Sequence, residues 1–349
     1  MTAGMVRRKR TAKGKKGGFF GKFVVFLLLV ALLAGGSAWL LLTPFGPTRE
    51  TFVEITPGSS TAGIGRQMES AGIVRSRYAL DVLSLWKRGT LKAGEYRFDH
   101  PAPLTEVYSR LRRGDVYTIE VTIPEGSSIF DIAQRLQQAG LPAGGDFVAA
   151  QAQNANLIQD LDPAAKSLEG YLFPDTYRFA RKATPIVILT TMVKRFKTEA
   201  ATLGLTQDVH SVVTLASLVE RETAVDSERP LVASVFENRL AKNMPLSTDP
   251  SVIYGLELQG RWRGTIYESD LKLDTPYNTY LHPGLPPGPV ANPGAKALTA
   301  AMNPATTDYL YFVAAGANAQ GKSLFSSSIE EHNRNVSGYR RAIKRAGGQ

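Results

Sequence analysis

Two glutamates, Glu220 and Glu222, stand two residues apart at the end of an apolar stretch with helical spacing. A carboxyl group can pass a proton to a substrate, and carboxyl groups of this kind cleave glycosidic bonds. Positions two apart lie about 200° apart around a helix, so these side chains cannot share one face. One can face a cleft, while the other, nearer the apolar stripe, needs an ion-pair partner. Periodicity does not say which one is catalytic.

A plainer interpretation stays open for this pair. A Glu-Arg-Glu run at a helix end is more often an ordinary charged surface. Hydrolysis with two carboxylates needs a second acid at a set separation, and Asp175 and Asp249 are distant in sequence unless folding brings one of them close.

Other chemistries find little support in the sequence. The four histidines, His100, His210, His282 and His332, have no metal-ligand spacing, and the chain has no cysteine. Residues 269–272 match a Ser-x-x-Lys pattern, but no Lys-Thr-Gly follows, so we interpret them as a helix turn. We expect no metal and no cofactor.

Aromatic and polar residues gather in segments rich in proline and glycine. Residues 169–177 place three aromatic residues around a Pro-Asp turn, which is either a sugar-stacking surface or a buried loop corner. Residues 246–255, 275–280 and 284–294 form loops of fixed shape that suit a polyhydroxylated substrate. The alternative is that several of these residues only structure the loops. The candidate substrate-binding residues are Glu220, Tyr171, Asp175, Thr248, Asp249, Tyr254, Tyr277, Asn278 and Tyr280.

Helices and short strands are interspersed in the second half of the chain. The patterns predict helices over 185–203, 208–223, 227–242 and 328–344, and a strand over 309–313. No regular βαβ alternation is present, so an α+β fold is preferred to a doubly wound sheet. We expect residues 166–349 to form the catalytic domain.

An internal repeat organises the segment before that domain. Residues 53–60 align with residues 121–128, and each copy predicts a strand, a glycine turn, a serine cap and a helix. We therefore expect two βα modules, at 43–117 and 118–165. The second copy resembles the opening of a LysM module, which binds N-acetylated glycans, although a purely structural unit is favoured.

The N-terminus combines a basic arm, 1–22, with an uncharged apolar run, 23–42. The arm holds eight positive side chains and no negative ones, which accounts for most of the net charge of +10. Such a pattern predicts a single transmembrane helix with the N-terminus in the cytoplasm and the rest outside the inner membrane. A cleaved signal peptide is the alternative. The net positive charge does not indicate nucleic-acid binding, because most of it lies beside the apolar run, where it sets membrane topology and contacts anionic lipid.

The order and spacing of several segments resemble the YceG family. These segments are 169–177, 215–224, 249–255, 277–280, 284–294 and 309–313. The resemblance implies a membrane-anchored, endolytic peptidoglycan transglycosylase near penicillin-binding synthases. It implies that Glu222, followed by Thr223, is the catalytic carboxyl; Arg221 replaces the lysine frequent in relatives.

The implied reaction cleaves the bond between N-acetylmuramic acid and N-acetylglucosamine in nascent strands and leaves 1,6-anhydro ends. This requires an uncharged Glu222 in a desolvated cleft. A membrane-anchored, peptidoglycan-binding scaffold without enzymatic activity is the alternative from another class.

Overall fold

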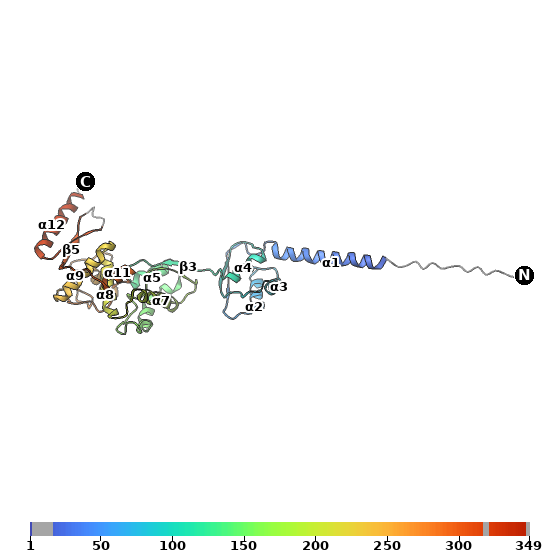
Figure 1. Ribbon diagram of the computed structural model, residues 1–349, viewed down its shortest axis with the longest axis horizontal. Helices are drawn as coiled ribbons and strands as arrows, with labels where there is room; N and C mark the ends of the chain where they lie inside the picture. Colours follow the sequence, from blue (N-terminus) through green and yellow to red (C-terminus); the bar gives the residue numbers. More distant parts are fainter. Residues whose placement is uncertain (2–16, 317–320, 347–349) are drawn as a thin grey trace. The chain divides into compact units, whose positions relative to one another are not determined.

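The computed structural model describes residues 1, 17–316 and 321–346, and it divides into two compact units (Figure 1). Unit 1 covers Met1–Tyr117 and unit 2 covers Thr118–Gln349. Most of the predicted basic arm, from Arg7 to Lys16, lies outside the described residues.

Unit 1 begins with a long exposed helix, α1 (Gly17–Leu42). Its stretch Phe20–Leu42 is apolar and long enough to cross a bilayer, and none of it is buried. A span and a signal sequence both fit these properties.

A small α+β module follows α1 in unit 1. Its elements are β1 (Thr51–Ile55), α2 (Thr61–Ser70), α3 (Arg77–Lys87), β2 (Gly94–Phe98) and α4 (Leu104–Arg113). Strands β1 and β2 pair antiparallel, with Val53 opposite Tyr96. The Ser60 side chain caps α2 by accepting the Gly63 amide, as the repeat predicts. Alternate strand residues and one face of each helix fill the core.

Unit 2 opens with the same order of elements. These are β3 (Ile119–Thr122), α5 (Ile129–Gln138), the 3₁₀ turn η1 (Pro142–Gly144), α6 (Phe147–Gln153), η2 (Ala155–Leu157) and β4 (Thr176–Phe179). Ser128 and Asp131 form a capping box at the start of α5. Strand β3 pairs antiparallel with β4, so this substructure extends past residue 165.

The remainder of unit 2 is mainly helical. It contains α7 (Pro185–Leu203), α8 (Val209–Glu222), η3 (Asp226–Glu228), α9 (Arg229–Ala241), α10 (Asp249–Leu258), η4 (Asp270–Lys272), α11 (Ala295–Met302), the β5 (Tyr311–Ala314) and β6 (Ser323–Ser326) hairpin, and α12 (Ile329–Ala346). Helix α8 packs against α9, α10 and α11, and Val209, Val213 and Val219 of its apolar stripe are buried. The predicted α+β class is confirmed.

A segment predicted as a loop is helical in the structure. Residues 249–258 form helix α10 rather than part of a rigid loop. Thr248 takes the N-cap position in extended conformation, and Pro250 lies in the first turn, where its missing amide costs no hydrogen bond. The Asp-Pro pair therefore starts a helix here, although it is equally common in turns.

Candidate active site

A cavity of about 350 Å³ opens in unit 2 at the end of α8. Its lining comes from α8, α9, the start of α10, the loop before α11, the β5 strand and α12. The lining residues are Glu222, Phe236, Arg239, Leu246, Ser247, Thr248, Asp249, Tyr280, Phe312 and His332. Folding thus brings together four of the predicted site residues, Glu222, Thr248, Asp249 and Tyr280.

Glu222 is the last residue of α8, and its side chain is partly buried in this cavity. The Thr248 hydroxyl donates a hydrogen bond to Glu222 Oε1. Burial raises the pKa of the Glu222 carboxyl, and the charge of Asp249 raises it further. The Thr248 hydrogen bond and the cations of Arg221 and Arg239 lower it, but burial dominates. A raised pKa is what a proton donor near neutral pH requires.

Asp249 lies beside Glu222 at the first turn of α10 and is exposed. The Tyr280 hydroxyl donates to Asp249 Oδ1 over 2.7 Å. Burial and the hydrogen bond to Asp249 raise the pKa of Tyr280, so its hydroxyl stays protonated and keeps donating to Asp249. The cavity therefore presents two carboxyl groups, those of Glu222 and Asp249, together with the hydroxyl groups of Ser247, Thr248 and Tyr280.

Arg239 of α9 supplies the positive charge of the cavity. Its guanidinium is held by backbone carbonyls: Nε donates to Leu310 over 2.7 Å, and Nη1 donates to Leu246 over 3.0 Å. It also lies 5.1 Å from the ring centre of Tyr311. With its hydrogen bonds taken by neutral groups, its charge remains available to a substrate or a developing anion.

His332 of α12 also lines the cavity. Its ring stacks on Tyr311 at 5.1 Å, and its Nδ1 atom has no hydrogen-bond partner among the described residues. Burial lowers the pKa of His332, and the charge of Arg239 lowers it further, which favours the neutral ring. Sequence reasoning missed Arg239, and it considered His332 only as a metal ligand.

Ser247, which lines the cavity, has an unusual backbone conformation. Its φ of 51° lies in the left-handed region, which a non-glycine residue adopts at some cost. The Ser247 amide donates to Thr279 over 3.1 Å, which holds the loop in place. This strained turn aims the next residue, Thr248, at Glu222.

Comparison with known proteins places the chain in a family. The model of the YceG-like family matches residues 53–338. The chain belongs to the YceG-like family. The resemblance inferred from the sequence segments is therefore confirmed, and it covers the part of unit 1 from residue 53 onward and most of unit 2.

Relatives of the YceG-like chain are found in several bacteria. The endolytic murein transglycosylase of Bacillus subtilis (strain 168) is 33% identical over 328 residues, 87% of this chain and 88% of that protein. The endolytic murein transglycosylase of Streptococcus pneumoniae (serotype 2, strain D39) is 31% identical over 90% of this chain and 64% of that protein. The crystal structure of a yceG-like protein from Listeria monocytogenes has a TM-score of 0.50 and 32% identity, and covers 82% of this chain and 99% of that one.

Glu220 has a different place from Glu222 in this YceG-like chain. Its side chain is 5% exposed, and Oε1 lies 2.6 Å from Nη1 of Arg229, which is equally buried. Glu220 Oε2 accepts the Gly294 amide over 3.0 Å. Both carboxylate oxygens are therefore occupied by protein donors, and Glu220 does not line the cavity. Its geometry is that of a structural ion pair rather than a substrate ligand.

The remaining predicted binding residues lie outside the cavity lining. Tyr171 is 1% exposed, and its hydroxyl donates to Asp162, so the aromatic segment forms a buried corner. Asp175 is exposed and accepts from Arg195 Nε over 2.8 Å. The Asn278 side chain is fully buried and donates to the Leu271 and Leu273 carbonyls.

Tyr254 and Tyr277 form an edge-to-face pair with ring centres 5.0 Å apart. Tyr254 is 2% exposed and lies on α10, facing the core that α8 shares. Burial raises the pKa of Tyr277 to about 12, as expected for a phenol packed among apolar groups. These two rings support the helix whose N-terminus carries Asp249.

A buried hydrogen-bond network joins the Asn-Pro-Gly segment at 292–294 to the Glu-Gly segment at 169–170. Asn292 Nδ2 donates to Glu169 Oε1 over 2.6 Å and to the Ser127 carbonyl over 2.9 Å, while its Oδ1 accepts the Leu172 amide. The Ile129 amide donates to Glu169 Oε2 over 2.9 Å. The network fastens the start of α5 to the loop before α11. Burial raises the pKa of Glu169 to about 8.

The Glu169 network should make stability depend on pH. A free glutamate ionises near pH 4.3, so between that pH and about 8 the unfolded chain gives up a proton that folded Glu169 keeps. Stability should therefore fall as the pH rises through this window. Melting temperatures from pH 5 to 9 should decrease in the wild type and change less in Glu169→Gln. Some slope should remain, because burial raises the pKa of Glu257 to about 7. An equal slope in both proteins would contradict this assignment.

No group of three or more potential metal ligands occurs in the described parts of the chain. The carboxyl, hydroxyl and guanidinium groups of the cavity match an acid-base reaction at a sugar.

Proposed function

We propose that this YceG-like protein cleaves peptidoglycan glycan strands internally and that Glu222 is its proton donor and acceptor. The family membership, and relatives named endolytic murein transglycosylases at 31% and 33% identity, support the substrate and the reaction. The observation that carries the residue assignment is a partly buried carboxyl with raised pKa in a polar cavity.

The proposed reaction needs one carboxyl group in two protonation states. Protonated Glu222 donates to the glycosidic oxygen between N-acetylmuramic acid and N-acetylglucosamine, and the C1–O bond breaks. The substrate's own N-acetyl group relieves the positive charge at C1. The Glu222 carboxylate then takes the proton of the C6 hydroxyl, whose oxygen bonds to C1. The products are a free C4 hydroxyl and a 1,6-anhydro end.

The other cavity groups have positioning roles in this proposal. Arg239 is placed to hold sugar hydroxyls or acyl oxygens, the Tyr280 oxygen can accept from a sugar hydroxyl, and Thr248 orients the Glu222 carboxyl. Asp249 raises the pKa of Glu222 by its charge. The open cavity suits a strand that passes through it, as internal cleavage requires.

Hydrolysis is a second candidate because Asp249 lines the same cavity as Glu222. Asp249 could activate water in a two-carboxylate mechanism. The hydrogen bond from Tyr280 to Asp249 Oδ1 occupies one of its oxygens, which favours the transglycosylase assignment. A non-catalytic scaffold would bind strands and leave them intact.

Incubating the full chain with uncrosslinked glycan strands distinguishes these functions. We expect shorter strands with new anhydromuramic ends by mass spectrometry. New reducing ends would indicate the hydrolase, and bound but uncut strands would indicate the scaffold.

We also propose that α1 is retained as a single membrane span, with the cytoplasm on its N-terminal side and both modules outside. The length and exposure of Phe20–Leu42 support this, and Lys22 is a basic residue at the cytoplasmic end. The span would place cleavage next to strands emerging from membrane-bound penicillin-binding synthases. For residues 118–165, which resemble a LysM module, a structural βα unit stays the favoured role over glycan binding.

The hydrogen bond from Thr248 should set the pH dependence of cleavage. Thr248→Val keeps the shape but removes a donor that stabilises the ionised form of Glu222, so the pKa of Glu222 should rise. A proton donor is lost as the pH rises through its pKa, so the descending limb of the rate profile should move to higher pH. Thr299→Val, an exposed change on α11, should leave the profile unchanged. A shift to lower pH in Thr248→Val would contradict this role.

A further inference from the structure

Helix α3 of unit 1 carries two apolar faces, and only one of them is used by the fold. Leu80 and Leu83 are buried in the core of the module. The other face consists of Tyr78, Val82, Leu85 and Trp86, which are 64%, 66%, 78% and 75% exposed. Their spacing of four, seven and eight residues puts them on one side of the helix. Four large apolar side chains gathered on a surface indicate a binding face.

The end of α1 is fastened to the same module. The Arg75 guanidinium lies 4.3 Å from the ring centre of Trp39 and 5.0 Å from that of Phe45. Arg75 also donates to the Thr43 hydroxyl, and Leu41 packs against the module's core. The module therefore begins directly where the apolar helix ends, without a free linker.

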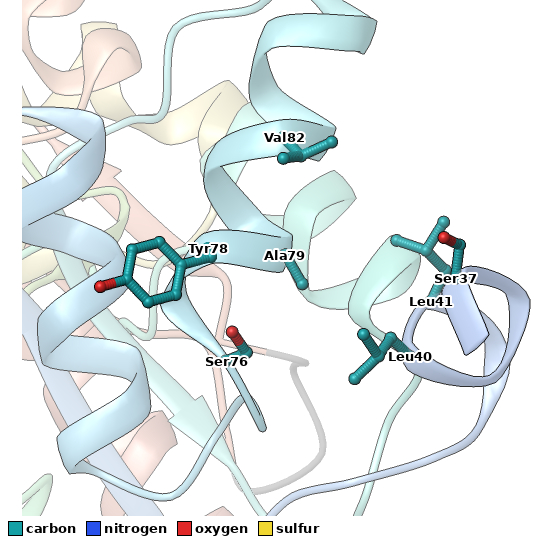
Figure 2. Close-up of a pocket in the computed structure, with 7 residues that line it drawn as sticks. All are labelled: Ser37, Leu40, Leu41, Ser76, Tyr78, Ala79 and Val82. Atoms are coloured by element: carbon teal, nitrogen blue, oxygen red, sulfur yellow. The ribbon is translucent and has the colours of Figure 1, made fainter. Parts of the chain in front are cut away.

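A groove between α1 and α3 shows at which position along α1 the start of α3 lies. A cavity of about 260 Å³ is lined by α1 and by the first turns of α3 with the residue before it (Figure 2). The lining residues are Ser37, Leu40, Leu41, Ser76, Tyr78, Ala79 and Val82. Ser37 lies in the apolar stretch, about 8 Å before Leu42 along a helix axis. If that stretch lies in lipid, Tyr78 and Val82 lie at the boundary between acyl chains and headgroups.

We propose that α3 is a second membrane contact, which inserts Tyr78, Val82, Leu85 and Trp86 into the leaflet where α1 leaves the bilayer. A lipid acyl chain occupies the groove between α1 and α3. Tyrosine and tryptophan are the side chains preferred at this depth, and Arg77 and Lys87 on the same helix can meet anionic headgroups. Such a contact would hold the module at a fixed orientation to the membrane. The inference rests on the proposed span of α1.

Site-directed spin labelling of the full chain in lipid nanodiscs tests this contact. The chain has no cysteine, so single cysteines can be introduced without other changes. Labels would be placed at Leu85 on α3, at Leu29 in the middle of α1, and at the exposed Thr202 on α7. The nanodiscs would contain phosphatidylglycerol and phosphatidylethanolamine. Collision rates with oxygen report lipid, and those with a water-soluble nickel chelate report water.

We expect the ratio of oxygen to nickel collisions at Leu85 to be severalfold higher than at Thr202 and to approach the ratio at Leu29. A Leu85 ratio equal to that at Thr202, with a high ratio at Leu29, would overturn the α3 contact and leave the span intact. Low collision rates with both reagents at Leu85 would also overturn it, because they indicate cover by protein. A low ratio at Leu29 would remove the span itself. None of these outcomes depends on the chemistry at Glu222.

Discussion

Replacing Glu222 by glutamine should reduce strand cleavage by about 10²–10⁴-fold, the range expected when a positioned acid-base group is lost. Glutamine keeps the size of the side chain and can still accept from the Thr248 hydroxyl. It cannot donate a proton to a leaving oxygen. Folding should be unaffected or slightly improved, because the change removes a carboxyl whose charge is disfavoured by burial. Anhydro ends per unit time, counted by mass spectrometry, measure the effect.

Glu237→Gln provides the matched control for this change. Glu237 is an exposed glutamate on α9 that does not line the cavity, so the same chemical change should leave cleavage at the wild-type rate. Both variants should bind intact strands, and only Glu222→Gln should leave them uncut. Wild-type cleavage by Glu222→Gln would remove the central residue from the proposed mechanism.

The neighbouring change, Glu220→Gln, should instead destabilise the protein. It leaves the buried Arg229 guanidinium without its closest carboxylate, and breaking such a pair typically costs about 3–5 kcal/mol. Because Arg229 keeps its contact with Asp226 at 3.3 Å, we expect a loss of stability near the lower end of this range. At about 2–4 °C per kcal/mol for a domain of this size, the melting temperature should fall by roughly 6–12 °C.

A double substitution separates the ion pair from other roles of Glu220. Glu220→Gln with Arg229→Met removes the isolated charge, so much of the lost melting temperature should return. Below its melting temperature, Glu220→Gln should retain more activity than Glu222→Gln. A Glu220→Gln protein of unchanged stability but without activity would reverse the roles assigned to the two glutamates.

The helices of the second half of the chain could largely be predicted from the sequence. The stripe of valines in α8 and the proline at the start of α7 place both helices within a residue or so of their bounds. The wheel argument also holds for the two glutamates: Glu220 faces protein donors, and Glu222 faces the cavity. Local periodicity is sufficient for such features because each depends on neighbours along one helix.

The set of residues that line the cavity could not be predicted from helical periodicity. Arg239 reaches the site because backbone carbonyls of distant segments hold its guanidinium, and His332 arrives from the last helix of the chain. Tertiary contacts of this kind leave no periodic signal. Conversely, Tyr171 and Asn278 have residue types suited to sugar binding, but their hydrogen-bonding groups are used inside the core. Residue type alone cannot distinguish these two uses.

The origin of the oxygen at the newly formed end tests the central claim most directly. The full chain would cleave uncrosslinked strands in water enriched in oxygen-18, and the new ends would be weighed by mass spectrometry. If Glu222 alone directs attack by the C6 hydroxyl, the new ends are 1,6-anhydro sugars without the heavy isotope. New reducing ends that carry oxygen-18 would show that water is the nucleophile, as in a hydrolase, and would contradict the account.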